Sequence, residues 1–175
     1  MTIGSASLAR NIYDIYHNNH KVPSDWSYLA SGSTRSVYLG PDGIVYKLCH
    51  DGDYDWNLVE NELARKWRGS KKLEPLETEV PRVRLHYGGH VKGESQYVLA
   101  MEYVPRAMEL DCHFYTGPDE PEDNSPCDCR YWGQARICFA VLCDRLEALG
   151  IHDMFSGNVH YGHDKLFHII DLGCD

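Results

Sequence analysis

Apolar residues near the start of the chain recur three and four positions apart, the spacing of one face of an α-helix. The positions on this face are Leu8, Ile12, Ile15 and Tyr16. The pair Asn18 and Asn19 follows them and is typical of a helix end. We therefore expect an amphipathic helix within residues 1–25.

From residue 26 to residue 49 the pattern changes to β-branched and aromatic residues, which favour strands. Turn-forming residues interrupt this stretch at 31–33 (Ser-Gly-Ser) and at 40–43 (Gly-Pro-Asp-Gly). Two further strand-like runs cover 82–87 and 97–103. The pattern predicts five antiparallel strands.

A second helix is predicted over residues 54–68, between the third and fourth strands, ending before Gly69. The residues expected on its apolar face are Trp56, Val59, Leu63 and Trp67. A helix inserted among antiparallel strands is expected to pack on their sheet, which gives an α+β fold class.

The second half of the chain predicts a loop, a helix and a hairpin. Residues 116–128 are acidic and rich in proline, so we expect an exposed loop there. A long helix that stops at Gly150 is expected next. Its apolar positions are Ala135, Cys138, Phe139, Leu142, Leu146 and Leu149. A short hairpin through Gly162 then leads to a strand over 167–170.

The composition narrows the class of protein. Hydrophobic residues make up 43% and charged residues 25%, as in folded globular chains. We find neither an apolar run of about 18 to 20 residues, as a membrane span needs, nor a secretory signal, so we expect a soluble cytoplasmic protein. The 26 acidic residues outnumber the 17 basic ones. This excess disfavours binding to nucleic acids and to anionic membranes, and favours a basic or neutral partner.

The seven cysteines are odd in number and follow no regular spacing, so we expect reduced thiols rather than a disulfide framework. A single residue separates Cys127 from Cys129, a sequence spacing that metal-binding cysteines often have. Without a second pair they are a weak zinc signal, and we interpret them as loop cysteines.

Several short motifs resemble, in order, those of the protein-kinase-like fold. Residues 44–48 (Ile-Val-Tyr-Lys-Leu) are similar to the strand that carries the kinase lysine, and 99–104 are similar to a kinase hinge. Residues 153–158 fit the DxxxxN catalytic loop, and 171–173 (Asp-Leu-Gly) look like the DFG element. The loop Asp-Met-Phe-Ser-Gly-Asn and the small size look most like small phage protein kinases related to T7-like phage early Ser/Thr protein kinases.

The resemblance implies a reduced two-lobed fold in a single domain. After the N-terminal helix, residues 26–103 are expected to form an N-lobe whose helix corresponds to the kinase αC helix, and 104–175 a truncated helical C-lobe. The resemblance also implies ATP and Mg²⁺ as cofactors, and serine or threonine of a host protein as the acceptor. The chain would then be phage-encoded and act in the host cytoplasm.

For the nucleotide, the resemblance implies that Val37 covers the adenine and that Met101 lies behind it. The Glu102 carbonyl and the Val104 amide would read the adenine edge. The segment before Val37 departs from the GxGxxG pattern. It keeps Gly32, but has Ala30 and Arg35 at the other two glycine positions. Small residues such as Ser33 still allow backbone amides to approach phosphate.

The charged residues suit phosphoryl transfer on chemical grounds as well. Lys47 lies inside an apolar strand, where burying its ammonium group is costly unless the group is paired. Glu60, on the next helix, is the expected partner. Glu62 is the alternative, but Arg65 and Lys66 follow it at helical spacing, so we expect it to face water.

Three residues near the end of the sequence complete the expected site. Asp153 is expected to orient the substrate hydroxyl and accept its proton. Asn158 and Asp171 are expected to hold Mg²⁺ through oxygen ligands. Taken singly, Asp153 also fits a turn and Asp171 a strand end. Together with Lys47 and Glu60 they indicate phosphoryl transfer.

Two other functions remain compatible with the sequence. One is a non-catalytic pseudokinase whose acidic loop captures a basic partner, which the altered glycine pattern favours. The other is a small-molecule phosphotransferase, because Ser-Gly-Asn at 156–158 also resembles the loop of aminoglycoside-type kinases.

Overall fold

The computed structural model describes residues 3–50, 55–107, 139–152, 154 and 157–172. The chain divides into two compact units. The first comprises Met1–Arg68 and Pro81–Tyr103, and the second comprises Gly69–Val80 and Val104–Gly173. Helices and strands of the described residues form an α+β fold, as predicted.

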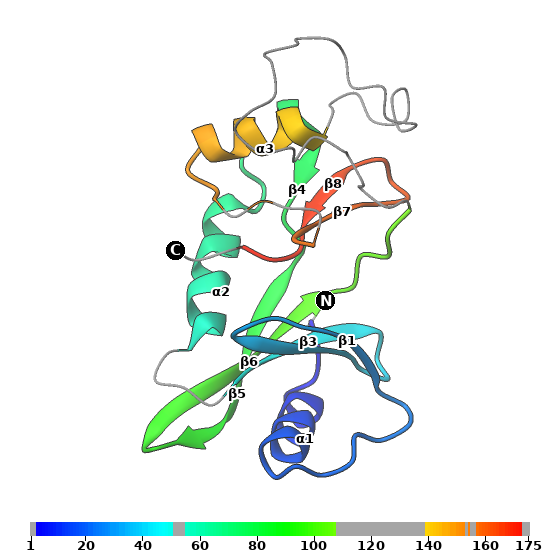
Figure 1. The fold of residues 1–175 in the computed structure, drawn as a ribbon, viewed down its shortest axis with the longest axis vertical. Helices are drawn as coiled ribbons and strands as arrows, with labels where there is room; N and C mark the ends of the chain where they lie inside the picture. Colours follow the sequence, from blue (N-terminus) through cyan, green and yellow to red (C-terminus); the bar gives the residue numbers. More distant parts are fainter. Residues whose placement is uncertain (1–2, 51–54, 108–138, 153, 155–156, 173–175) are drawn as a thin grey trace, which may run out of the picture. The chain divides into compact units, whose positions relative to one another are not determined.

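The first unit is built on a five-stranded antiparallel sheet with strand order β1-β2-β3-β6-β5 (Figure 1). The strands are β1 (Ser27–Ser31), β2 (Arg35–Leu39), β3 (Ile44–Cys49), β5 (Val83–Val91) and β6 (Glu94–Glu102). The five antiparallel strands predicted from the sequence are therefore confirmed. The hairpin β5–β6 is longer than expected, because Lys92 and Gly93 form a two-residue turn with positive φ angles of 50° and 89°.

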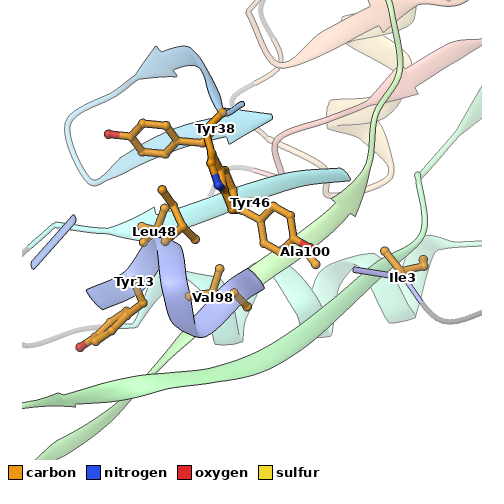
Figure 2. Packing of buried hydrophobic residues seen from close by; sticks show 10 residues of the cluster. Ile3, Tyr13, Tyr38, Tyr46, Leu48, Val98 and Ala100 are labelled. Carbon is orange, nitrogen blue, oxygen red and sulfur yellow. The ribbon is translucent and has the colours of Figure 1, made fainter. Parts of the chain in front are cut away.

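One face of this sheet packs against helix α1 (Ala6–His17), the predicted N-terminal helix. Side chains alternate along a strand, so Tyr46 and Leu48 on β3 share a face with Val98 and Ala100 on β6. These four side chains form the core cluster of the unit with residues of α1 and β2 (Figure 2). The other members of the cluster are Ile3, Ala9, Ile12, Tyr13, Trp26 and Tyr38.

Tyr13 of α1 lies close to the backbone of β5 at Gly88 and Gly89, next to a register shift after Tyr87. A Cβ atom added at Gly88 would lie 2.6 Å from Cδ2 of Tyr13, whose side chain is buried.

We expect Gly88→Ala to destabilise the protein by about 1–3 kcal/mol, the usual cost of overpacking, as measured by urea denaturation. Gly32→Ala is the matched control, because nothing lies within 4 Å of its added Cβ. Equal stability of the two variants would contradict this packing.

Helix α2 (Trp56–Trp67) packs against β3, β5 and β6. Of its predicted apolar face, Trp67 is buried as expected. The other buried residues are Asn57, Glu60 and Ala64, each one position after a predicted one. Polar contacts between the helix and the sheet decide which face is buried. Glu60 therefore lies on the buried face of the helix.

The second unit contains a three-stranded sheet with order β4-β8-β7. Its strands are β4 (Thr78–Glu79), β7 (Val159–Tyr161) and β8 (Phe167–Ile169). Strands β7 and β8 form the predicted hairpin through Gly162. Helix α3 (Phe139–Ala148) buries Leu142 and Leu146 completely. The expected start of this helix, with Ala135 and Cys138, lies outside the described residues.

Residues 69–80 fall inside the N-lobe predicted over 26–103, but they belong to the second unit. After a 3₁₀ turn (Glu74–Leu76), β4 pairs in parallel with β8, so that Thr78 lies opposite Phe167. The amide of Phe167 also donates to the carbonyl oxygen of Glu77, at 2.8 Å. These backbone hydrogen bonds, rather than any apolar pattern, assign the segment to the second unit.

In the described part of the chain, no helix has the length and apolar character needed to cross a membrane. The acidic segment 116–128 lies outside the described residues, and so do Cys127 and Cys129.

Candidate functional site

The candidate site of the first unit is centred on Lys47 of β3. Lys47 lies opposite Val37 on β2 and Leu99 on β6, so the three side chains share the sheet face that is turned away from α1. The Lys47 side chain is only 3% exposed. The sheet thus holds an ammonium group in a largely apolar setting, where a charged partner is required.

Glu60 of α2 is that partner. Nζ of Lys47 lies 2.8 Å from Oε1 and 3.0 Å from Oε2 of Glu60. The Glu60 side chain is 2% exposed, whereas Glu62 faces solvent. The predicted pairing of Lys47 with Glu60 rather than with Glu62 is therefore confirmed.

Arg35 of β2 also contacts Glu60, through Nη1 and Oε2, and is itself buried. The sequence interpretation placed Arg35 in the altered glycine pattern but gave it no partner. Strand alternation contained the signal, since Arg35 lies two positions before Val37 and therefore on the same sheet face. One carboxylate is thus shared by two cations from neighbouring strands.

Two polar residues at the start of α2 fix this helix to the sheet. Nδ2 of Asn57 donates to the carbonyl oxygens of Lys47 and Tyr97, at 2.9 and 2.7 Å. Asp55 caps the helix by accepting from the amide of Asn57, and it also accepts from the amide of Tyr97 at 2.7 Å. Sequence reasoning missed both anchors, although an aspartate just before a helix is a usual capping signal.

Burial governs the protonation of the groups around Asp55. Burial raises the pKa of the Asp55 carboxyl, although hydrogen bonds from Tyr97 and Cys49 oppose this. Burial also raises the pKa of the Cys49 thiol to about 12. Cys49 therefore stays protonated and donates to Oδ1 of Asp55 at 3.5 Å. Such a thiol is structural rather than nucleophilic.

The turn between β1 and β2, which contains Gly32 and Ser33, is exposed but tied down. The amide of Gly32 donates to the carbonyl oxygen of Arg35 at 2.9 Å. His50, just after β3, holds the tip by two hydrogen bonds. Its amide donates to Thr34 O at 2.8 Å, and its Nδ1 donates to Ser33 O at 3.1 Å. The Gly32 amide is thus used within the hairpin.

The segment expected to be the hinge is divided between the two units. Met101 is 4% exposed and lies on the same sheet face as Leu99. Glu102 is the last residue of β6. Val104 belongs to the second unit, where its carbonyl oxygen accepts from Nδ1 of His160 at 2.8 Å.

Arg82 binds the Glu102 carboxylate with both Nε and Nη2, at 3.0 and 2.7 Å. These hydrogen bonds lower the pKa of Glu102 below its ordinary value of 4.5. Ionised Glu102 is thereby favoured in the folded chain. Its contribution to stability is complete above pH 4.5 and is lost as the pH falls through the lower folded pKa.

We expect Arg82→Gln to be less stable than the wild type at neutral pH, and the difference to vanish in acid as Glu102 becomes protonated. Thermal unfolding of both proteins between neutral and strongly acidic pH measures this. A difference that persists undiminished in acid would show that Arg82 acts through packing and not through the ionised carboxylate.

In the second unit the β7–β8 hairpin brings Asn158 and Asp171 together. The buried Asn158 accepts at its carbonyl oxygen from the amides of Ile170 and Asp171, at 2.9 and 3.3 Å. The backbones of Asn158, which has an amide side chain, and Asp171, which has a carboxylate, are thus hydrogen-bonded to each other. Both are oxygen donors of the type that Mg²⁺ prefers. Asp153 lies outside the described residues.

Among the described residues no group of three or more His, Cys, Asp or Glu side chains is arranged to hold a metal ion. The donor set of Asn158 and Asp171 is of a different kind. Mg²⁺ commonly takes one or two protein oxygens and completes its shell with water and substrate phosphates. The chemistry of this pair therefore fits a magnesium ion.

No family model matches this chain, and no curated protein matches it.

Proposed function

We propose that this protein is an ATP- and Mg²⁺-dependent Ser/Thr protein kinase, phage-encoded and acting on host proteins. The observation that carries the proposal is the buried ion pair between Lys47 on β3 and Glu60 on α2. Burying this pair costs desolvation energy that an apolar pair would not. A lysine held in one orientation by a carboxylate is what a site for nucleotide phosphates requires.

The first unit would bind the nucleotide. Lys47 supplies positive charge to the phosphates, and Glu60 keeps its ammonium group oriented. Val37, opposite Lys47 on the same face, would cover the adenine, and Met101 would lie behind it. The Glu102 carbonyl and the Val104 amide are the proposed contacts to the adenine edge.

The second unit would supply the metal ligands and the base. Mg²⁺ held there would supply positive charge to the phosphates. Asn158 and Asp171 would hold it through their side-chain oxygens. Asp153 would hydrogen-bond the serine or threonine hydroxyl, orient its oxygen and accept its proton.

Transfer of labelled phosphate from ATP to proteins of a mixed cell lysate tests the proposal. We expect the wild type to label proteins and Lys47→Met to label them far less. Lys21→Met is the control, because Lys21 is exposed and lies outside the site. A wild type that labels nothing, or a Lys47→Met variant as active as the control, would overturn the proposal.

Magnesium binding provides a separate prediction. We expect Mg²⁺ to strengthen ATP binding by the wild type and to have little effect on Asp171→Ala, which should retain adenine binding. Calorimetric titration with ATP, with and without Mg²⁺, measures this. Asp144→Ala is the control, because Asp144 is exposed on α3. Equal magnesium dependence in Asp171→Ala and the wild type would exclude Asp171 as a ligand.

One observation favours a second candidate, a non-catalytic nucleotide-binding protein that captures a basic partner. The Gly32 amide is engaged within its hairpin, and Arg35 stands where the resembled family has a glycine. Fewer backbone amides would then be directed at phosphate. Binding of ATP without any phosphate transfer would identify this alternative.

A further inference from the structure

Arg35 is a buried cation in a segment where the resembled kinases carry glycine. Arg35 is 9% exposed, and its side chain lies on the same face of the sheet as that of Val37. A guanidinium is costly to bury unless it is paired, and the partner here is Glu60 on α2. The contact joins the β1–β2 hairpin to the helix that also carries the partner of Lys47.

Arg35 and Lys47 converge on the same oxygen. Oε2 of Glu60 accepts from Nη1 of Arg35 and from Nζ of Lys47, the latter at 3.0 Å. Lys47 has a second bond to Oε1 at 2.8 Å. Two cations are therefore held side by side by one carboxylate.

The hairpin backbone explains why a side-chain cation is useful here. In glycine-rich loops, backbone amides bind the phosphates. In this chain the Gly32 amide donates to Arg35 O, and His50 holds the carbonyl groups of Ser33 and Thr34. With the Gly32 amide engaged in the hairpin, a side-chain cation can supply charge that this amide does not.

We propose that Arg35 is a second phosphate-binding cation of the site, an inference that rests on the proposed function. Without nucleotide, Arg35 pairs with Glu60 and so links β2 to α2. When ATP binds, its guanidinium donates to phosphate oxygens beside Lys47. A guanidinium carries five donors in a planar fork that fits carboxylate and phosphate oxygens, so one arginine can contact both.

Calorimetric titration of the wild type and of Arg35→Gln with Mg²⁺·ATP, tripolyphosphate and adenosine tests this role. We expect Arg35→Gln to weaken ATP and tripolyphosphate binding by about 10- to 100-fold, the range for a hydrogen bond to a charged group. Adenosine binding should stay unchanged. The control is Arg10→Gln, because Arg10 is an exposed arginine paired with Asp14 on α1, and it should change none of the three affinities.

The outcomes separate this inference from the proposed function. Equal losses of ATP and adenosine binding in Arg35→Gln would mean that Arg35 only supports the fold, and would overturn the inference. The inference would also be overturned if Arg35→Gln bound ATP and tripolyphosphate as tightly as the wild type does. A wild type that binds neither ATP nor adenosine would overturn the proposed function itself.

A measurement on the wild type covers the case in which Arg35→Gln does not fold. The Nε–H resonance of Arg35, assigned through its side-chain connectivity, should shift on addition of tripolyphosphate and stay in place with adenosine. A resonance that tripolyphosphate leaves unmoved would overturn the inference.

Discussion

Replacing Asp153 by asparagine is expected to lower the rate of phosphate transfer by about 10² or more, the scale of general acid–base catalysis. Asparagine keeps the size of the side chain and a hydrogen bond to the substrate hydroxyl, but it cannot accept the proton. The variant should therefore still bind ATP. Steady-state transfer of labelled phosphate to a protein substrate measures the loss in kcat.

The control for this substitution is Asp144→Asn on α3, whose exposed carboxylate has no assigned role. Calorimetric titration with ATP establishes that both variants bind nucleotide as the wild type does. Transfer by Asp153→Asn at the wild-type rate would remove Asp153 from the mechanism and favour another proton acceptor.

Replacing Glu60 by glutamine is expected to destabilise the protein by about 3–5 kcal/mol, the usual cost of breaking a buried ion pair from one side. Glutamine has nearly the same shape but no charge. The substitution therefore removes the carboxylate that Arg35 and Lys47 share, in a setting where both cations are almost fully buried. Urea denaturation measures the change in the free energy of unfolding.

Two variants make this prediction specific. Glu62→Gln makes the same chemical change on the exposed side of the same helix, and should alter stability by no more than about 0.5 kcal/mol. Lys47→Met should cost less than Glu60→Gln, because Arg35 still pairs with Glu60. Equal losses for Glu60→Gln and Glu62→Gln would contradict a shared buried carboxylate.

Turn chemistry made most of the large sheet predictable. The residues Gly40-Pro41-Asp42-Gly43 separate β2 from β3, and Gly43 has a φ of 73°, which favours glycine. The sequence prediction does not include the Lys92-Gly93 turn. The predicted strands 82–87 and 97–103 are therefore shorter than β5 and β6 on the side of this turn. Local backbone preferences of this kind are readable from the sequence without knowledge of the tertiary contacts.

The orientation of α2 was less predictable, because polar groups rather than apolar ones define its buried side. Asn57 is completely buried, yet it faces the sheet to donate to two backbone carbonyls. An apolar pattern gives no weight to such a residue, and so it favoured Trp56 and Leu63. The pairing of Lys47 with Glu60 was nevertheless predicted correctly, because the cost of burying a charge requires a partner.

Strand β4 could not be predicted, because two residues carry no periodic pattern. Its pairing with β8 depends on backbone hydrogen bonds to a segment near the far end of the chain. Arg35 was assigned no partner for a related reason, since Glu60 meets it only after β2, β3 and α2 have assembled.

The parallel pairing of β4 with β8 also sets an order of assembly. All strands of the larger sheet have been synthesised by the end of β6 at Glu102, whereas β8 begins only at Phe167. During translation the first unit can therefore fold before β4 has a neighbouring strand. In the sequence, β4 lies between the two segments of that unit, Met1–Arg68 and Pro81–Tyr103. Pairing across such a long separation is slow, because loop closure must precede the contact. Residues 69–80 therefore reach their place in the second unit only after Phe167–Ile169 have been synthesised.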